Sequence, residues 1–122
     1  MREILFRGKS KAQGSEWLYG DVLIYENSAQ IWETINNRKH NSVVALETIG
    51  QFTGLTDCNG KKIFEGDIVY DTIDRENALI IFDIGMYYVH NDKMHIRLGV
   101  SMSMQVEVIG NIHDNPELLK GE

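Results

Sequence analysis

The sequence predicts a mainly β fold, and three observations carry the prediction. Short stretches rich in aromatic and β-branched residues recur along the 122 residues, as strands require. Turn residues, above all glycine and asparagine, separate these stretches at short intervals. No long run shows the 3.6-residue period of an amphipathic helix. A chain of this length, 43% hydrophobic and 25% charged, buries enough surface to fold without a disulfide or a metal.

The N-terminal part of the chain predicts strands joined by polar turns. Residues 3–7 begin a β segment, and residues 17–25 form a long strand of aromatic and branched side chains. Glu26-Asn27-Ser28 has turn chemistry and residues 30–35 then alternate polar with apolar, so we expect a hairpin. The all-polar segment 36–42 is predicted to be a mobile loop.

The later part of the chain predicts further strands separated by glycine and asparagine turns. Asn59-Gly60 is a strong turn signal, because this pair supports the positive φ angles of a primed hairpin turn. Asn91-Asp92-Lys93 is predicted to turn the chain between an apolar segment and His95. We expect strands over residues 65–69, 78–84 and 105–112.

One short C-terminal helical turn is predicted near the end of the chain. Asn115 is a good N-cap, Pro116 stands at the first helical position, and Glu117 favours the helix dipole. Leu118 and Leu119 follow and are expected to dock on the core.

Bulk properties predict a cytoplasmic protein without a membrane segment. Charges interrupt the first apolar run after three residues, so no signal-peptide core fits there. Cys58 is the single cysteine, which excludes an internal disulfide and four-ligand cysteine zinc sites. Residues 1–46 carry six basic and five acidic side chains, and residues 47–122 carry six and thirteen, for net charges of +1 and −7.

The charge distribution leaves nucleic-acid binding as an alternative function. Phosphate neutralisation dominates nucleic-acid affinity, so the acidic C-terminal part is a poor surface for it. Four basic residues near the N-terminus are the candidate phosphate contacts: Arg2, Arg7, Lys9 and Lys11.

Two long motifs resemble the YopX family of phage and prophage proteins. Residues 47–69 read ETIGQFTGLTDCNGKKIFEGDIV, and residues 108–119 read VIGNIHDNPELL. The segments REILFR at 2–7 and WLYGD at 17–21 are similar to the family's N-terminal part, although Gly8 replaces the usual aromatic residue. The resemblance covers essentially the whole chain.

The resemblance implies a small phage-encoded accessory protein of the bacterial host's cytoplasm. Its N-terminal β region, residues 1–46, would pack on a C-terminal SH3-like barrel, residues 47–122. The family offers no catalytic residue that can be transferred to this chain. We interpret the polar and glycine positions of the first motif as structural turns: Gly50, Gly54, Asp57, Asn59, Gly60, Gly66 and Asp67.

No catalytic, metal or cofactor site is predicted. The segment after Asp57 fails the calcium-loop spacing, and Cys58 has no evident base beside it. A hairpin could bring His90 and His95 together with Asp92, but no third protein ligand stands at a diagnostic spacing.

We therefore expect a non-enzymatic binding or assembly module that acts through protein contacts. One expected partner is a host or phage protein. Further copies of the chain are also expected, because residues 78–82 are apolar at five successive positions and would have no polar face. A second reason to expect a homo-oligomer is an apolar, methionine-rich surface, since such surfaces often serve as adaptable contact faces. It runs through Met86, Tyr87, Val89, Met94, Met102 and Met104. The candidate contact residues are Met86, Tyr87, Tyr88 and Met104.

Overall fold

The structure, a computed structural model, describes residues 2–12 and 16–120. Among these described residues, 57% lie in strands and the two sheets are antiparallel, which confirms the mainly β prediction. The chain divides into two compact units, residues 1–52 and 53–122. The division falls inside the strand Gly50–Thr56, whereas the family resemblance implies a boundary between residues 46 and 47.

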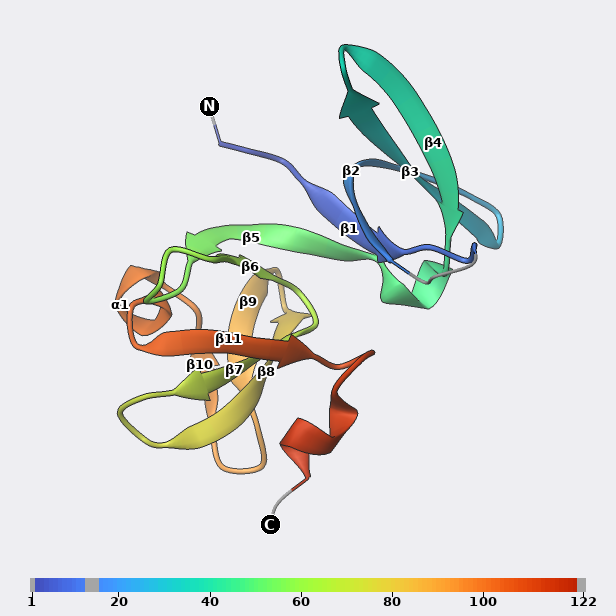
Figure 1. The fold of residues 1–122 in the computed structure, drawn as a ribbon. Helices are drawn as coiled ribbons and strands as arrows, with labels where there is room; N and C mark the ends of the chain where they lie inside the picture. The colour runs from blue at the N-terminus through green and yellow to red at the C-terminus, as the bar shows by residue number, and fades with distance from the viewer. Residues whose placement is uncertain (1, 13–15, 121–122) are drawn as a thin grey trace. The chain divides into compact units, whose positions relative to one another are not determined.

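A six-stranded antiparallel sheet has the order β4-β3-β2-β1-β5-β6. Strands β1 to β4 belong to the first unit, and β6 (Lys62–Phe64) belongs to the second. Figure 1 draws its first four strands from blue to teal. A single 3₁₀ turn separates β4 from β5, and β5 continues into the second unit. The elements are β1 (Phe6–Lys9), β2 (Trp17–Tyr25), β3 (Ser28–Ile35), β4 (Arg38–Val44), η1 (Leu46–Thr48) and β5 (Gly50–Thr56).

The predicted hairpin is confirmed, and the predicted mobile loop is wrong. Strands β2 and β3 pair up to Tyr25↔Ser28 around a two-residue turn. The segment 36–42 is not a loop, because most of it belongs to β4, which pairs with β3 along its whole length. Asn36 and Asn37 have φ angles of 53° and 64°, which asparagine tolerates and a primed turn requires. The polar side chains of β4 suit an exposed strand at a sheet edge.

The core of the first unit comes from alternate positions on its strands. Leu18, Ala29, Ile31 and Val44 are buried, and half-buried apolar side chains, among them Phe6, pack against them. Successive side chains of a strand point to opposite faces. The face opposite the core therefore carries Leu23, Gln30 and Val43, which are paired neighbours on β2, β3 and β4.

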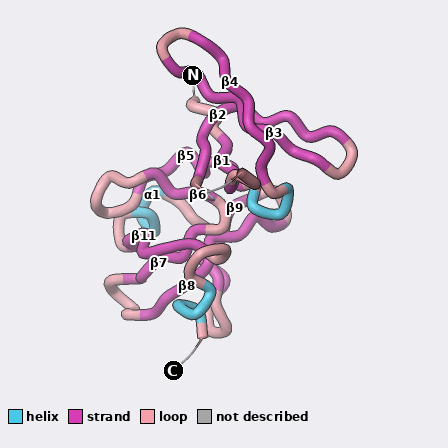
Figure 2. The backbone as a smooth tube through the Cα atoms, turned by 45° about the vertical axis from the view of Figure 1, so that its right-hand side comes forward, coloured by secondary structure: helices cyan, strands magenta, loops and turns pink. Residues whose placement is uncertain are grey.

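The second unit contains a five-stranded antiparallel sheet with the order β10-β9-β8-β7-β11. The short helical segments α1 and η2 stand out in cyan in Figure 2. Among the described residues the ladders leave this sheet open between β10 and β11, so the SH3-like barrel is not confirmed. The elements are β6 (Lys62–Phe64), β7 (Asp67–Asp71), β8 (Glu76–Asp83), β9 (Met86–His90), β10 (His95–Arg97), α1 (Val100–Ser103), β11 (Val106–Asn111) and η2 (Pro116–Leu119).

The core of the second unit absorbs much of the apolar surface that the sequence assigned to subunit contacts. On β8, Ala78 and Ile80 are buried, whereas Leu79 on the opposite face is half-buried. Val89 and Met102 also belong to the core, so their assignment to a methionine-rich outer surface is wrong. The physical reason is the helix α1, which the sequence did not predict and which carries Met102.

The predicted C-terminal helical turn is present as the 3₁₀ turn η2, with Pro116 at its start. Asn115 precedes it but makes no side-chain cap hydrogen bond. Its Oδ1 instead accepts a hydrogen bond from the backbone N–H of Asn111, at 3.2 Å.

Candidate binding site

The motif residue Asp57 is a buried structural acceptor. Its Oδ1 accepts hydrogen bonds from the backbone N–H groups of Asn59 and Lys61, at 2.9 and 2.8 Å. Its Oδ2 accepts one from the N–H of Val108, at 2.8 Å. Residues 57 and 108 come from the two family motifs, so this carboxylate joins the motifs within one unit.

The turn at Gly60 is real, but it is not the primed turn that the sequence predicted. The Gly60 N–H donates to the Asp57 carbonyl at 3.0 Å, which makes Gly60 the fourth residue of the turn. Gly60 has a φ of +83°, and Asn59 is not among the residues with positive φ. A primed Asn-Gly turn needs positive φ at both residues, so this turn is of another type. The Asp57 carboxylate closes it by accepting hydrogen bonds from the N–H groups of Asn59 and Lys61.

The other motif positions divide between turns and strands. Gly54 and Gly66 have φ angles of +90° and +92°. The Oδ2 of Asp67 accepts a hydrogen bond from the Phe64 N–H at 2.7 Å and closes the turn around Gly66. Gly50 is not a turn residue, since it opens β5 opposite Arg7 with an ordinary backbone angle.

The four predicted contact residues do not form one surface. Met86 and Tyr88 alternate with the buried Val89 and lie on the face of β9 away from the core. Tyr87 packs against the core and meets the ring of Phe82 edge to face, with centroids 5.1 Å apart. Met104 follows α1 and is 68% exposed.

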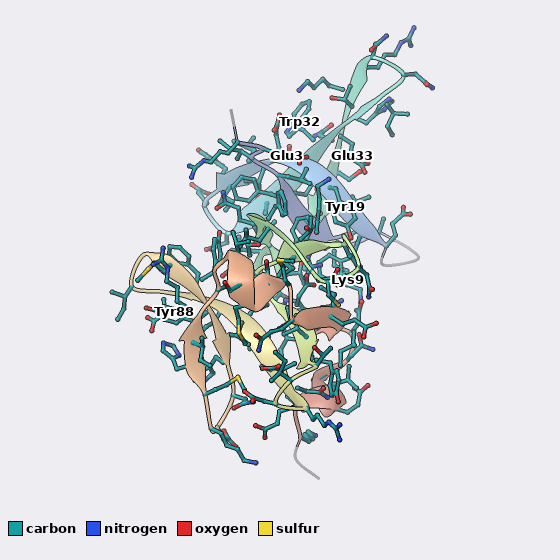
Figure 3. All side chains as sticks on the ribbon, turned by 90° about the vertical axis from the view of Figure 1, so that its left-hand side faces the viewer. Glu3, Lys9, Tyr19, Trp32, Glu33 and Tyr88 are labelled. Atoms are coloured by element: carbon teal, nitrogen blue, oxygen red, sulfur yellow. The ribbon has the colours of Figure 1, made fainter. Side chains whose placement is uncertain are left out.

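The outer face of the β8-β9-β10 sheet carries a histidine cluster. The Nδ1 atoms of His90 and His95 lie 3.0 Å apart, as the predicted hairpin allows. The ring of Tyr88, labelled in Figure 3, stacks on His95 at 4.1 Å and 16°. The carboxylate near this pair belongs to Asp83, whose Oδ2 lies 3.7 Å from His95 Nε2, rather than to the predicted Asp92.

A groove of about 630 Å³ lies beside this cluster, within the second unit. Its apolar lining comes from strands β7 and β8 and from η2, and its polar lining carries both charge signs. The lining residues are Tyr70, Arg75, Glu76, Asn77, Leu79, His90, Asn91, Asp92, Lys93, Leu118, Leu119 and Lys120.

Hydrogen bonds from side-chain amides hold together the segments that line the groove. The Asn77 Nδ2 donates to the Leu118 carbonyl at 2.9 Å and holds η2 against the sheet. The Asn91 Nδ2 donates to the Asn77 carbonyl at 3.0 Å and attaches the β9–β10 turn to β8. The Lys93 ammonium lies 2.9 Å from the Glu76 carboxylate. The groove is therefore held by contacts between segments that are distant in the sequence.

Sequence reasoning did not find this groove. It expected Leu118 and Leu119 to dock on the core, whereas both are half-buried and line the groove. The available signal was the polar Asn77 next to the apolar run that begins at residue 78. Such an asparagine reads as a turn residue unless its distant partner is known.

The basic N-terminal residues do not form a single exposed patch. Arg7 is 6% exposed, and its guanidinium carbon lies 4.8 Å from the centre of the Trp17 ring. Arg2 and Lys11 are exposed, whereas Lys9 is half-buried. Of the four predicted phosphate contacts, Arg7 is therefore buried and Lys9 is half-buried.

Within residues 2–12 and 16–120, no group of three or more histidine, cysteine, aspartate or glutamate side chains surrounds a common metal position. The helical segments in the same ranges are too short to cross a bilayer.

Comparisons with known proteins relate the chain to one family and one fold. The crystal structure of protein EF1440 from Enterococcus faecalis superposes with a TM-score of 0.66, covering 98% of this chain and 100% of that one at 24% identity. At this identity the likeness shows a shared fold. No curated protein matches the sequence. The family model described as YopX protein matches residues 5–120, and the chain therefore belongs to the YopX family.

Proposed function

We propose that the protein is a non-enzymatic binding module that takes a short peptide segment of a host or phage protein into the groove of its second unit. The groove itself carries the proposal, because its volume of about 630 Å³ falls within the usual range for ligand sites. Half-buried Leu79, Leu118 and Leu119 supply apolar contact area there.

The rim gives the partner's expected chemistry. Glu76 is paired with Lys93, which leaves Arg75 and Lys120 against Asp92 as the remaining charged residues of the groove. The local charge is therefore slightly positive in a chain whose net charge is −6. A segment with one or two large apolar side chains and an acidic flank would complement this groove.

A peptide-library selection tests the proposal. We expect the protein to enrich apolar-acidic peptides, and Leu119→Glu to abolish the enrichment because it places a charge in the groove. Val100→Glu is the matched control, since Val100 is exposed on α1 and does not line the groove. Equal enrichment by the wild-type protein and Leu119→Glu, or no enrichment by either, would reject the proposal. Circular dichroism of both variants checks that the fold is retained.

Nucleic-acid binding through the N-terminal basic residues is the alternative, and a mobility-shift assay distinguishes it from peptide binding. It depends on Arg2 and Lys11, because Arg7 is committed to Trp17. A mobility shift that weakens steeply with salt and is lost on changing Arg2 and Lys11 to alanine would favour it over peptide binding.

A further inference from the structure

The β9–β10 hairpin places two histidines directly opposite each other. The Asn91 N–H donates to the Met94 carbonyl, and the Leu98 N–H donates to the Tyr87 carbonyl. Hydrogen-bonded and non-hydrogen-bonded pairs alternate along an antiparallel ladder, so His90 and His95 form a non-hydrogen-bonded pair. In such pairs the side chains approach most closely.

The turn that sets this register is itself well defined. The Asn91 Oδ1 accepts hydrogen bonds from the N–H groups of Lys93 and Met94, at 2.7 and 2.9 Å. The Asn91 amide also donates to the Asn77 carbonyl of the neighbouring strand. The histidine pair therefore stands on a hairpin whose geometry is fixed by hydrogen bonds at its turn.

The two imidazole rings turn the same nitrogen toward each other. Their Nδ1 atoms are 3.0 Å apart, and the rings meet at 85°. The stacked ring of Tyr88 restrains the plane of His95. On the other side of the His95 ring, the Asp83 carboxylate lies 3.7 Å from Nε2, where it favours the tautomer with the proton on Nε2. In that tautomer the His95 Nδ1 accepts a hydrogen bond from the Nδ1–H of His90. A metal ion bound between the rings would replace this proton, which would move to the Nε2 of His90.

We propose that His90 and His95 form a two-histidine clip for a divalent transition-metal ion of the zinc, nickel and copper class. Zinc–nitrogen bonds of about 2.0–2.1 Å at a tetrahedral angle place two nitrogens about 3.4 Å apart, so the pair needs to open by only about 0.4 Å from its present separation. Imidazole nitrogen suits these ions, whereas magnesium and calcium prefer oxygen ligands.

The clip supplies two ligands and leaves the other coordination positions to water. Asp83 acts from outside the coordination sphere as a positioning residue, and its carboxylate has to move from the present 3.7 Å to hydrogen-bond distance of the His95 Nε2. A carboxylate bonded to the far nitrogen of a metal-bound histidine orients the ring and raises its basicity. Both histidines are exposed, so the ion has access from solvent. The proposal does not rest on peptide binding: His90 also lines the groove, but the other lining residues take no part in the clip.

The test of the clip is a zinc titration of chelator-treated protein. Calorimetry measures the binding, and NMR of the histidine rings locates it. We expect one ion per chain, with the largest changes at the Nδ1 atoms of His90 and His95. His90→Ala and His95→Ala should each weaken zinc binding at least about tenfold, and Asp83→Asn should weaken it by about tenfold without changing the stoichiometry. Magnesium should give no binding.

The matched controls are His40→Ala and His113→Ala, which remove exposed histidines outside the pair. They should bind zinc as the wild-type protein does. The clip would be refuted by zinc affinity that is unchanged in His90→Ala and His95→Ala, by ring signals that respond at His40 or His113 instead, or by no binding at millimolar zinc. Circular dichroism separates loss of the site from loss of the fold.

Discussion

Among single residues, Asp57 links more of the second unit than any local sequence signal indicates. The sequence identified it as a turn residue, and its bonds to Asn59 and Lys61 agree with that role. Its third partner, the N–H of Val108, lies 51 residues away in the chain. Turn chemistry is local and could be predicted, whereas the distant bond depends on the sheet register that brings β11 to this turn.

Replacing Asp57 with alanine should therefore destabilise the protein by about 3 kcal/mol, because three backbone donors lose a charged acceptor in a buried place. Urea denaturation measures the change in unfolding free energy. Asp74→Ala is the control at an exposed aspartate, where a change within about 0.5 kcal/mol is expected. An effect of Asp57→Ala no larger than that of the control would contradict the structural role.

At the scale of elements, the strands with apolar patterning were predictable and those without it were not. Residues 17–25 form β2 as predicted, since their aromatic and branched side chains favour a strand. Strand β4 was mistaken for a loop because its residues are almost all polar, and its place is set by the Asn36-Asn37 turn and by pairing with β3. Helix α1 could not be predicted, because it has neither a side-chain cap hydrogen bond nor an acidic residue in its first turn.

The turn at Gly60 gives a prediction at this scale. Gly60→Val should cost more than about 1 kcal/mol, since a β-branched residue resists the φ of +83°. No atom lies within 4 Å of the added Cβ position, so the cost would come from the backbone and not from a clash. Gly60→Asn is the matched variant and should retain most of the stability, because asparagine tolerates this region. An unchanged melting temperature in Gly60→Val would count against this interpretation.

For the whole chain, the two units could be anticipated in outline but the groove could not. The family resemblance implied an N-terminal and a C-terminal β region, and the structure gives each unit its own core, around Ile31 in the first and Val89 in the second. The groove depends on Asn77 binding the Leu118 carbonyl across 41 residues. The approach of His90 to His95 could be predicted, because their five-residue separation suits a hairpin. The nearby Asp83 could not be predicted, because it lies on a third strand, β8.

Self-association is the remaining proposal at this scale. Val89 and Met102 are core residues and so are not available for subunit contacts. However, Leu23 and Val43 stay 50% and 48% exposed on either side of Gln30, and Tyr25, 70% exposed, follows two residues later on the same face. Apolar side chains gathered on one sheet face commonly mark a contact with another molecule. We therefore propose that the outer face of β2-β3-β4 joins copies of the chain.

Light scattering over a concentration series tests this proposal. We expect the mean mass to rise above that of one 14.0 kDa chain, and Leu23→Glu to return it to that value while the β signal in circular dichroism stays unchanged, because a charge on this face opposes its burial. Tyr87→Glu is unsuitable as a test, since that ring packs against the core of the second unit. Ile73→Glu is the matched control at an exposed isoleucine in the turn between β7 and β8, and it should leave the mass of the assembly as it is. A constant monomer mass at every concentration, or equal effects of Leu23→Glu and Ile73→Glu, would exclude assembly through this face.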